Sequence, residues 1–440
     1  MDKKPRMLVT APVTTRSGYG AHARDIVLSL LDLDKYEVTV FPVRWGNTAM
    51  DYLDENDKQH KRILDVLIYD LNEKTYPQPD YHIHIVIPNE FQQWGTTYNI
   101  GITAGTEFTA NPGEWVEGLN KMDMTIVPSH FTKNVCLNTK YDKLDERTKK
   151  KIGEAMVTKP MEVLFEGYDE TIYSPSKVVT SDLTTELNKI KENFCFLVCG
   201  HWLQGKFGND RKDVASTIKL YYDTFKNVIN KPALILKTSG ATTSVIDRYD
   251  ILKKIDDIKK ASGGNLKTLP KIYFLHGDLT DDQMNELYNH IKVKAMVSLT
   301  HGEGFGRPLL EFATTGKPII ASDWSGQVDF LHKGYNSLLP GELKEIPKDS
   351  FPKNIYVKEA KWFIVNYGVA RSVLKNITKN YKKFKKKALK QQQYAKKFTR
   401  DKMTEKLGEI LDMYLPKPVQ NVDLKLPKLK KVNLPKLKKL

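Results

Sequence analysis

A short stretch near residue 300 constrains the fold of this 440-residue chain more than any other. An apolar run at 295–299 leads into the glycine-rich turn 301–306, and Pro308 follows where a helix would start. Because the fixed φ of proline suits the first turn of a helix, the pattern predicts a strand, a tight loop and a helix N-terminus. Without side chains, Gly304 and Gly306 let a ligand approach the backbone, and the free N–H groups of the helix favour a phosphate there.

Two glutamates flank this loop with seven residues between them, Glu303 before the turn and Glu311 in the predicted helix. Carboxylates so close to a phosphate would repel it, so we expect them to accept hydrogen bonds from neutral hydroxyls on either side of it. A nucleotide sugar has sugar hydroxyls on one side of a diphosphate and ribose hydroxyls on the other. The spacing therefore indicates a nucleotide-sugar site, and the plainer alternative is a loop with two solvated glutamates.

The complete motif from residue 303 to residue 322 reads Glu-Gly-Phe-Gly-x-Pro-x-x-Glu, followed by Ala-x-x-Gly-x-Pro-Ile-Ile-Ala-Ser. It resembles the donor-site signature of retaining glycosyltransferases of the GT-B fold, in the large family 4-like group that includes sucrose synthases and bacterial mannosyl- and glucosyltransferases. The resemblance implies an α/β architecture in which two Rossmann-like domains with parallel sheets face each other across a cleft. It also implies metal-independent transfer of a sugar, with retention, from a UDP-, GDP- or ADP-sugar to an unknown acceptor.

The resemblance assigns roles to the residues of the motif. Glu303 would hold a sugar hydroxyl and take part in catalysis, and Glu311 would hold the ribose hydroxyls. The backbone of Gly304, Phe305 and Gly306 would face the donor phosphate and sugar. A non-catalytic sugar-binding relative remains an alternative, although such a relative would usually have lost one of these glutamates.

A basic loop precedes the helix predicted to start at residues 211–214. In the resembled family an Arg/Lys pair in this loop binds the diphosphate and stabilises it as it leaves, because both side chains bind phosphate strongly. Lys212 matches the lysine best, Arg211 is the nearest arginine, and Lys206 is the substitute if the loop folds differently. Backbone groups near Leu279 would hold the base, so its identity stays open. A solvated basic loop is the alternative.

The chain opens with a predicted strand at 7–13, the glycine loop Gly18-Tyr19-Gly20 and a helix. The loop also fits the dinucleotide fingerprint Gly-x-Gly-x-x-Ala, so an NADP-dependent oxidoreductase, with Arg44 on the 2′-phosphate, is the alternative function. Against it, four residues separate the strand from the glycines, and no acidic residue ends the second strand at 36–43. In the resembled family Gly18, Tyr19 and Gly20 would touch the donor diphosphate or the acceptor.

Two further segments resemble the first domain of these glycosyltransferases. Over 99–132, Glu107 would face the cleft and position the acceptor or assist at the reacting carbon, and Ser129 would cap a helix. A solvated or structural glutamate is the alternative for Glu107. The segment 163–169 resembles the one that closes the first domain, commonly Asn-Gly-Val-Asp, with Glu166 in place of the usual asparagine.

The domain organisation follows from these motifs. We predict an N-terminal Rossmann-like acceptor domain at 1–180, a nucleotide-sugar domain at 190–360, C-terminal helices at 361–414 that partly cross back to the first domain, and a basic tail at 415–440. Further strands are predicted at 63–69, 82–87 and 99–104.

The formal net charge of +16 predicts an anionic partner. The tail from residue 417 has eight lysines and one aspartate and repeats Leu-Pro-Lys-Leu-Lys-Lys at 426–431 and 434–439. Leucines among lysines favour binding to an anionic membrane surface. A solvated tail is one alternative. Nucleic acid is a less favoured one, because the tail lacks aromatic residues that could stack on bases. With no signal peptide and no 18-residue apolar run, we expect a cytoplasmic protein with peripheral membrane association through the tail.

No metal is predicted from the sequence. The His, Cys and Asp residues show no metal-ligand spacing, and the three cysteines suggest reduced core residues. Asp32-Leu33-Asp34 has the spelling of a metal-binding Asp-x-Asp, but it falls in the turn between the first helix and the second strand.

Overall fold

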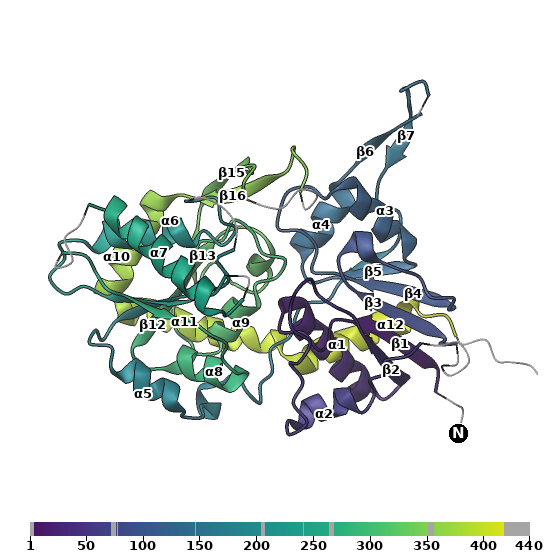
Figure 1. Ribbon diagram of the computed structural model, residues 1–440, viewed down its shortest axis with the longest axis horizontal. Coiled ribbons are helices and arrows are strands. Elements are labelled where there is room, and N and C mark those ends of the chain that lie inside the picture. The colour runs from purple at the N-terminus through teal and green to yellow at the C-terminus, as the bar shows by residue number, and fades with distance from the viewer. Residues whose placement is uncertain are drawn as a thin grey trace, which may run out of the picture.

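Two six-stranded parallel sheets, each covered by helices, form two adjacent domains, so the predicted α/β architecture of two Rossmann-like domains is confirmed (Figure 1). The computed structural model describes residues 4–71, 76, 78–145, 147–203, 207–240, 242–263, 268–350 and 356–417. The repeated Leu-Pro-Lys-Leu-Lys-Lys segments and Lys206 lie outside the described residues.

The first sheet has the strand order β2-β1-β3-β4-β5-β8, and all its neighbouring strands are parallel. The strands are β1 (Arg6–Ala11), β2 (Glu37–Pro42), β3 (Tyr81–Ile85), β4 (Tyr98–Ile102), β5 (Met124–Val127) and β8 (Met161–Val163). The helices are α1 (Gly18–Leu33), α2 (Lys58–Leu64), η1 (Pro88–Glu90), α3 (Gly113–Lys121) and α4 (His130–Asn138). Every residue of β3 and of β5 is buried, as expected for parallel strands that are covered on both faces.

The second sheet has the order β11-β10-β9-β12-β13-β14 and is also parallel throughout. The strands are β9 (Cys195–Cys199), β10 (Ala233–Lys237), β11 (Ile272–Leu275), β12 (Val293–Ser298), β13 (Ile319–Ser322) and β14 (Ser337–Leu339). The helices are α6 (Val214–Phe225), α7 (Val245–Ala261), α8 (Asp281–Asn289), α9 (Arg307–Ala313) and η3 (Gly326–Asp329). Along the chain, η2 (Pro175–Lys177) and α5 (Asp182–Asn188) come between the two sheets, and α5 lies beside α8 of the second domain (Figure 1).

Side-chain caps fix the starts of several helices beside the domain boundary. The hydroxyl of Ser17 accepts from the N–H of Gly20 at the start of α1, and the hydroxyl of Ser129 accepts from the N–H of Thr132 at the start of α4. The predicted N-cap at Ser129 is therefore confirmed. Because each cap follows a strand directly or by a short loop, it also sets where the neighbouring loop turns towards the other domain.

The predicted strand at 63–69 is wrong. Asp57 caps α2, which extends to Leu64, and beyond it only an isolated bridge joins Leu67 to Val40. A short apolar run fits a buried helix and a buried strand equally well, and here the cap decides for the helix.

The helical pattern predicted from residue 362 onward is wrong at its beginning. The strand β16 (Lys361–Val365) pairs antiparallel with β15 (Gly341–Glu345). Trp362 is buried in one apolar cluster with Phe108 of the first domain, and the backbone N–H of Thr109 donates to the carbonyl of Lys361 at 3.1 Å. Long-range packing of this hairpin onto the first domain therefore overrides the local pattern.

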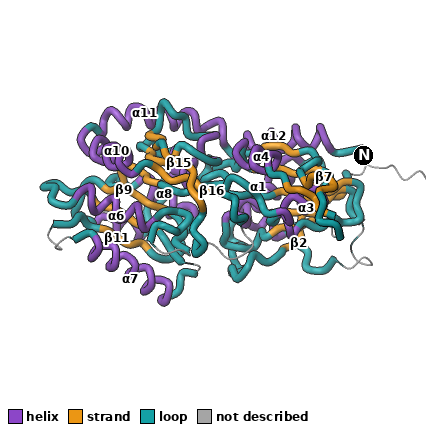
Figure 2. The backbone as a smooth tube through the Cα atoms, turned by 90° about the horizontal axis from the view of Figure 1, so that it is seen from above, coloured by secondary structure: helices purple, strands orange, loops and turns teal. Residues whose placement is uncertain are grey.

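The last helices of the described residues run from the second domain to the first. Figure 2 shows α11 (Tyr381–Ala395) over the second domain and α12 (Arg400–Tyr414) over the first. The helix α10 (Tyr367–Lys379) precedes them, and the short η4 (Lys396–Phe398) joins α11 to α12. Apolar residues of α12 complete the core of the first domain, namely Met403, Leu407, Ile410 and Leu411. The last helix is thus a structural part of the first domain.

A second hairpin, β6 (Tyr141–Leu144) and β7 (Lys151–Ala155), projects from the first domain (Figure 1).

None of the helices in the described ranges is long and apolar enough to cross a membrane.

Candidate functional site

The glycine-rich loop lies between β12 and α9, against the first domain. Gly306 has φ 103°, a left-handed conformation that suits glycine, and it precedes α9. The helix has seven residues and begins at Arg307, so Pro308 is its second residue rather than its first. Glu311 is buried in its second turn. The predicted strand, tight loop and helix are all present.

Four charged side chains meet where this loop faces the first domain. Lys212 contacts Oε1 of Glu303. A guanidinium nitrogen of Arg211 lies 2.9 Å from Oε1 of Glu107 and 3.7 Å from Oε2 of Glu303. The structure therefore brings together all four residues predicted to be catalytic, and it draws them from three separate segments of both domains.

Burial and ion pairing act in opposite directions on this cluster. Burial raises the pKa of Glu303, but Lys212 and Arg211 outweigh it and hold that pKa below its ordinary value. Burial, together with the nearby Arg211, lowers the pKa of Lys212 below its ordinary value, although Glu303 acts in the opposite direction. Burial also lowers the pKa of Arg211, but Glu107 and Glu303 outweigh that effect and raise it. An anion that bound beside Lys212 would strengthen the hold of this ammonium on its proton.

The predicted reason for glycine at position 304 is wrong. A Cβ on Gly304 would lie 2.4 Å from the carbonyl oxygen of Ala104, and a Cβ on Gly302 would lie 2.1 Å from that of Glu107. The hydroxyl of Ser129 donates to the carbonyl of Gly304 at 2.6 Å. Both glycines therefore permit close approach of the first domain's backbone, rather than of a ligand.

Phe305 and Gly306 contact the second domain itself. Phe305 is buried, and its ring packs on that of Phe330 with the ring centres 4.8 Å apart. A Cβ on Gly306 would lie 3.3 Å from Cβ of Gln327. The side chain of Phe305 is thus used in packing within the second domain, and the predicted contact of this backbone with the donor stays a prediction.

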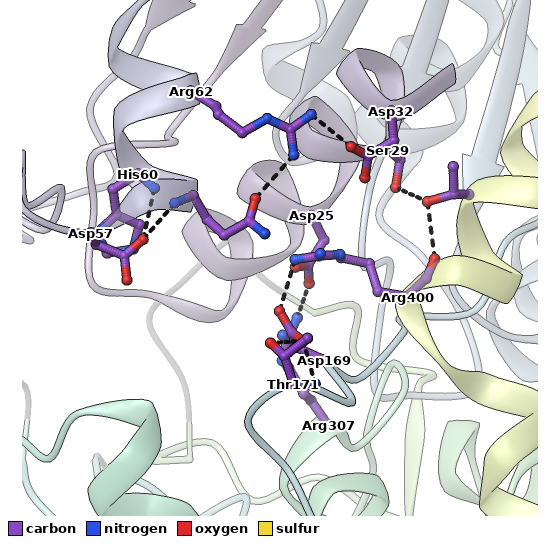
Figure 3. A network of polar contacts seen from close by, with 12 residues as sticks. Asp25, Ser29, Asp32, Asp57, His60, Arg62, Asp169, Thr171, Arg307 and Arg400 are labelled. Carbon is purple, nitrogen blue, oxygen red and sulfur yellow. Dashed lines mark hydrogen bonds and ion pairs between the residues drawn. The ribbon is translucent and has the colours of Figure 1, made fainter. Parts of the chain in front are cut away.

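Glu311 belongs to a second charged group that also spans the domain boundary. Nε of Arg307 donates to Oε1 of Glu311 at 3.0 Å, and the hydroxyl of Tyr288 donates to Oε2 at 3.2 Å. The other end of the Arg307 guanidinium pairs with Asp25 of α1 (Figure 3). Burial raises the pKa of Glu311 to about 7, and Arg307 offsets this only in part.

Sequence reasoning missed Arg307 and Asp25. Arg307 occupies an unspecified position of the motif, and Asp25 lies in the first helix, outside every motif of the sequence. The signal that could have pointed to Arg307 is its charge, at an unspecified position of a motif that is otherwise buried. The contact of Asp25 depends on the packing of the two domains, which no local pattern reveals.

The predicted glycine loop Gly18-Tyr19-Gly20 is wrong, because these residues form the first turn of α1, which is capped by Ser17. One of the three positions is open and two are occupied. A Cβ on Gly20 would lie 2.2 Å from the carbonyl oxygen of Thr15, whereas nothing lies within 4 Å of a Cβ on Gly18. The hydroxyl of Tyr19 is hydrogen-bonded to that of Thr103 at 2.9 Å. Tyr19 thus supports the end of β4. The backbone at Gly18 is the part of this helical turn that faces open space.

Leu279 lies in the loop between β11 and α8, where it packs on the apolar core of the second domain. Beside it, Asp278 lies 3.6 Å from Nε of Arg16 in the first domain. This loop, where the base was predicted to bind, also reaches the domain boundary.

A cavity of about 340 Å³ opens between the domains beside Arg307. Its volume falls within the usual range of small-molecule sites. Residues of both domains line it, including Arg16, Arg24, Tyr52, Asp281, Arg307 and Arg400. On its wall, Arg400 pairs with Asp169 at 2.8 Å (Figure 3).

The described part of the chain contains no group of three His, Cys, Asp or Glu residues arranged to hold a metal ion. Asp32 and Asp34, which have the spelling of a metal motif, pair instead with Arg62 at 2.6 Å and Lys4 at 2.5 Å.

Comparison with known proteins gives one family match. Residues 263–342 match the family described as "Glycosyl transferases group 1". This segment includes the glycine-rich loop, Glu303 and Glu311. A search of curated proteins finds no match.

Many solved structures share the fold. A glycosyltransferase from Rickettsia africae is 12% identical, with a TM-score of 0.57 over 93% of this chain and 98% of that one. Anabaena Alr3699/HepE in complex with UDP and glucose is 13% identical, with a TM-score of 0.58 over 93% of this chain and all of that one. Sucrose-phosphate synthase from Thermosynechococcus elongatus is 11% identical, with a TM-score of 0.58 over 93% and 99% of the two chains. At these identities the likeness establishes the fold.

Proposed function

Because the chain has the GT-B fold and carries the donor segment of the group 1 glycosyl transferases, we propose that it transfers a sugar, with retention, from a nucleotide diphosphate donor bound between its domains. The observation that carries the proposal is the meeting of Glu107, Arg211, Lys212 and Glu303 at the domain boundary. The likeness to HepE, which was solved with UDP and glucose, supports a nucleotide-sugar donor. The NADP-dependent alternative has no comparable support.

The proposed chemistry follows from the charges of this cluster. As the bond from the sugar to the diphosphate breaks, negative charge develops on the leaving phosphate. Lys212 and Arg211 stabilise that charge in a buried setting, where fixed positive groups act strongly. Their positive charges provide this stabilisation without a divalent cation. Glu303 orients Lys212 and accepts a hydrogen bond from a sugar hydroxyl, and Glu107 holds Arg211 in place.

Other residues hold the donor. Glu311 accepts hydrogen bonds from the ribose hydroxyls, Leu279 lies beside the base, and the backbone at Gly18 approaches the diphosphate. The backbone of Phe305 and Gly306 lines the phosphate side, while Tyr19 and Gly20 hold the first turn of α1 in place. In this proposal residues 190–360 bind the donor and residues 1–180 bind the acceptor.

We also propose that the lysine-rich tail brings the enzyme to an anionic membrane surface, where it would work as a peripheral protein. The support is compositional, since the repeated leucine and lysine residues combine apolar and cationic groups. The acceptor itself stays open.

A thermal-shift screen tests the donor. UDP-glucose, GDP-mannose, ADP-glucose and NADPH would be added in turn to the wild type, to Glu311→Ala and to the control Glu409→Ala, whose side chain is exposed on α12. A ligand that binds the folded state raises Tm. We expect one nucleotide sugar to stabilise the wild type and the control but not Glu311→Ala.

Two results would contradict this proposal. Stabilisation by NADPH alone would favour the oxidoreductase. A nucleotide sugar could also stabilise the protein while no acceptor, water included, leads to release of free nucleoside diphosphate. That result would favour a non-catalytic sugar-binding protein.

A further inference from the structure

Glu166 lies on a rigid loop that follows β8 and enters the boundary between the domains. The crossing segment at the start of α12 holds this loop from behind. The N–H of Gly167 donates to Sδ of Met403 at 3.3 Å, and the N–H of Arg400 donates to the carbonyl of Tyr168 at 2.8 Å. A Cβ on Gly167 would lie 2.6 Å from Cα of Arg400. The position of the Glu166 backbone is therefore fixed by the fold.

The side chain of Glu166 is buried and lacks a pairing partner. The residue is only 9% exposed, yet within the described ranges its carboxylate has no hydrogen bond and no ion pair. Three charged groups on other elements act on it, Arg307 of α9, Asp25 of α1 and Glu303 of the glycine-rich loop. An unpaired carboxylate on a residue so little exposed is costly to keep ionised, so its presence calls for a reason.

The charges of the cleft are unbalanced around this residue. The charges that act on Glu166 are one cation, Arg307, and two further carboxylates, Asp25 and Glu303. Arg307 already pairs with Asp25 and Glu311. A donor diphosphate adds about two negative charges, because each bridging phosphate carries one. Binding it beside an ionised and unpaired Glu166 would be unfavourable.

Protonation of Glu166 removes this conflict. Burial raises the pKa of Glu166 to about 7; Arg307 opposes this, while Asp25 and Glu303 add to it. The approach of a diphosphate would raise it further. The protonated carboxyl is also an O–H donor, whereas the carboxylate only accepts.

We propose that Glu166 is a donor-binding residue that takes up one proton from solvent when the nucleotide sugar binds, and that its neutral carboxyl donates a hydrogen bond to a donor oxygen. This inference rests on the proposed function. It adds that donor affinity depends on pH through one residue outside the family motif.

Isothermal titration calorimetry tests the proposal on the full chain. The probes are UDP-glucose, GDP-mannose and ADP-glucose, whose bridging phosphates do not titrate between pH 6 and 8. Titrations at pH 6, 7 and 8, in buffers of low and high ionisation enthalpy, count the protons taken up. The variants are Glu166→Gln and Glu166→Asn. The control is Glu162→Gln on β8, whose side chain accepts from the hydroxyl of Tyr414 at 2.7 Å.

Because Glu311 also titrates near pH 7, the effect of Glu166 is measured against the two Glu166 variants. At pH 8 the wild type and the control should take up nearly one proton more than Glu166→Gln and Glu166→Asn. The affinity of the wild type relative to that of Glu166→Gln should be about tenfold lower at pH 8 than at pH 6, because one pH unit above the pKa leaves about a tenth of Glu166 protonated. Glu166→Gln should bind about tenfold more tightly than the wild type at pH 8.

Two results would overturn the inference while leaving the proposed function intact. Undiminished proton uptake by Glu166→Gln would assign the proton to another group, such as Glu311. Weak binding by Glu166→Gln at every pH, with unchanged thermal unfolding, would show that the ionised carboxylate holds the donor. Failure of all three nucleotide sugars to bind the wild type would overturn the proposed function and this inference together.

Discussion

Arg211 of the second domain lies 2.9 Å from Glu107 of the first, and the same guanidinium reaches Glu303 at 3.7 Å. One side chain therefore joins the two domains and the glycine-rich loop. Because Arg211, Lys212 and Glu303 all belong to the second domain, separating the domains would break the pair between Arg211 and Glu107 and leave the others in place. The geometry of the proposed site thus depends on closure of the two domains.

Replacing Gly302 should prevent this closure. In Gly302→Ala the new Cβ would lie 2.1 Å from the carbonyl oxygen of Glu107, which is backbone and cannot move aside cheaply. We expect both domains to stay folded, the radius of gyration in small-angle X-ray scattering to increase, and sugar transfer to fall. The control is Gly153→Ala in the β6–β7 hairpin, where nothing lies within 4 Å of the new Cβ. Unchanged scattering and activity for Gly302→Ala would contradict the closed site.

Removing the ammonium of Lys212 should slow the chemical step. Loss of one group that stabilises charge in the transition state typically reduces kcat by about 10²- to 10³-fold. We expect a loss of this size for Lys212→Met in an assay of nucleoside diphosphate release, and little change for the control Lys219→Met, whose side chain pairs with Asp223 on α6. A full kcat in Lys212→Met would remove this lysine from the mechanism.

Stability at alkaline pH should depend on Lys317. Its Nζ donates to the carbonyls of Tyr288 and His290 at 2.7 and 2.8 Å, and burial lowers its pKa to about 6. The unfolded chain, with an ordinary lysine pKa near 10.4, binds more protons between these values. The contribution of Lys317 to the free energy of unfolding therefore rises with pH between 6 and 10, by at most about 1.4 kcal/mol per pH unit.

Urea unfolding at pH 7, 8 and 9 checks this effect. The difference in unfolding free energy between the wild type and Lys317→Met isolates Lys317 from the other titrating groups. It should shift in favour of the wild type as the pH rises, whereas Lys253→Met, an exposed lysine of α7, should show no such trend. A constant difference for Lys317→Met would mean that this lysine stays charged in the folded state.

Truncation after Lys417 should separate membrane binding from catalysis. We expect the truncated chain to keep its Tm and its donor binding, because the removed residues lie beyond α12, and to lose binding to vesicles that contain anionic lipid. Co-sedimentation with anionic and with neutral vesicles measures the difference. Equal binding of the full chain to both kinds of vesicle would rule out an electrostatic attachment.

The sequence predicted those parts of the fold and site that are encoded locally. The strand, glycine turn and helix around Glu303 lie within one short segment, so their residue types were sufficient. The strand at 63–69 failed because a cap at Asp57, not periodicity, decided the structure. Arg307 and Asp25 could not be paired from sequence because the contact joins residues far apart in the chain, and only the docking of α9 on α1 creates it.

The place of α12 in the first domain has a consequence for the order of events during synthesis. The strands of the first sheet leave the ribosome early, but Met403, Leu407 and Leu411 of their core are made only after the whole second domain. Until α12 has been synthesised, the face of α1 that packs against Gly408 stays uncovered. During that time the first half of the nascent chain can bind chaperones or aggregate.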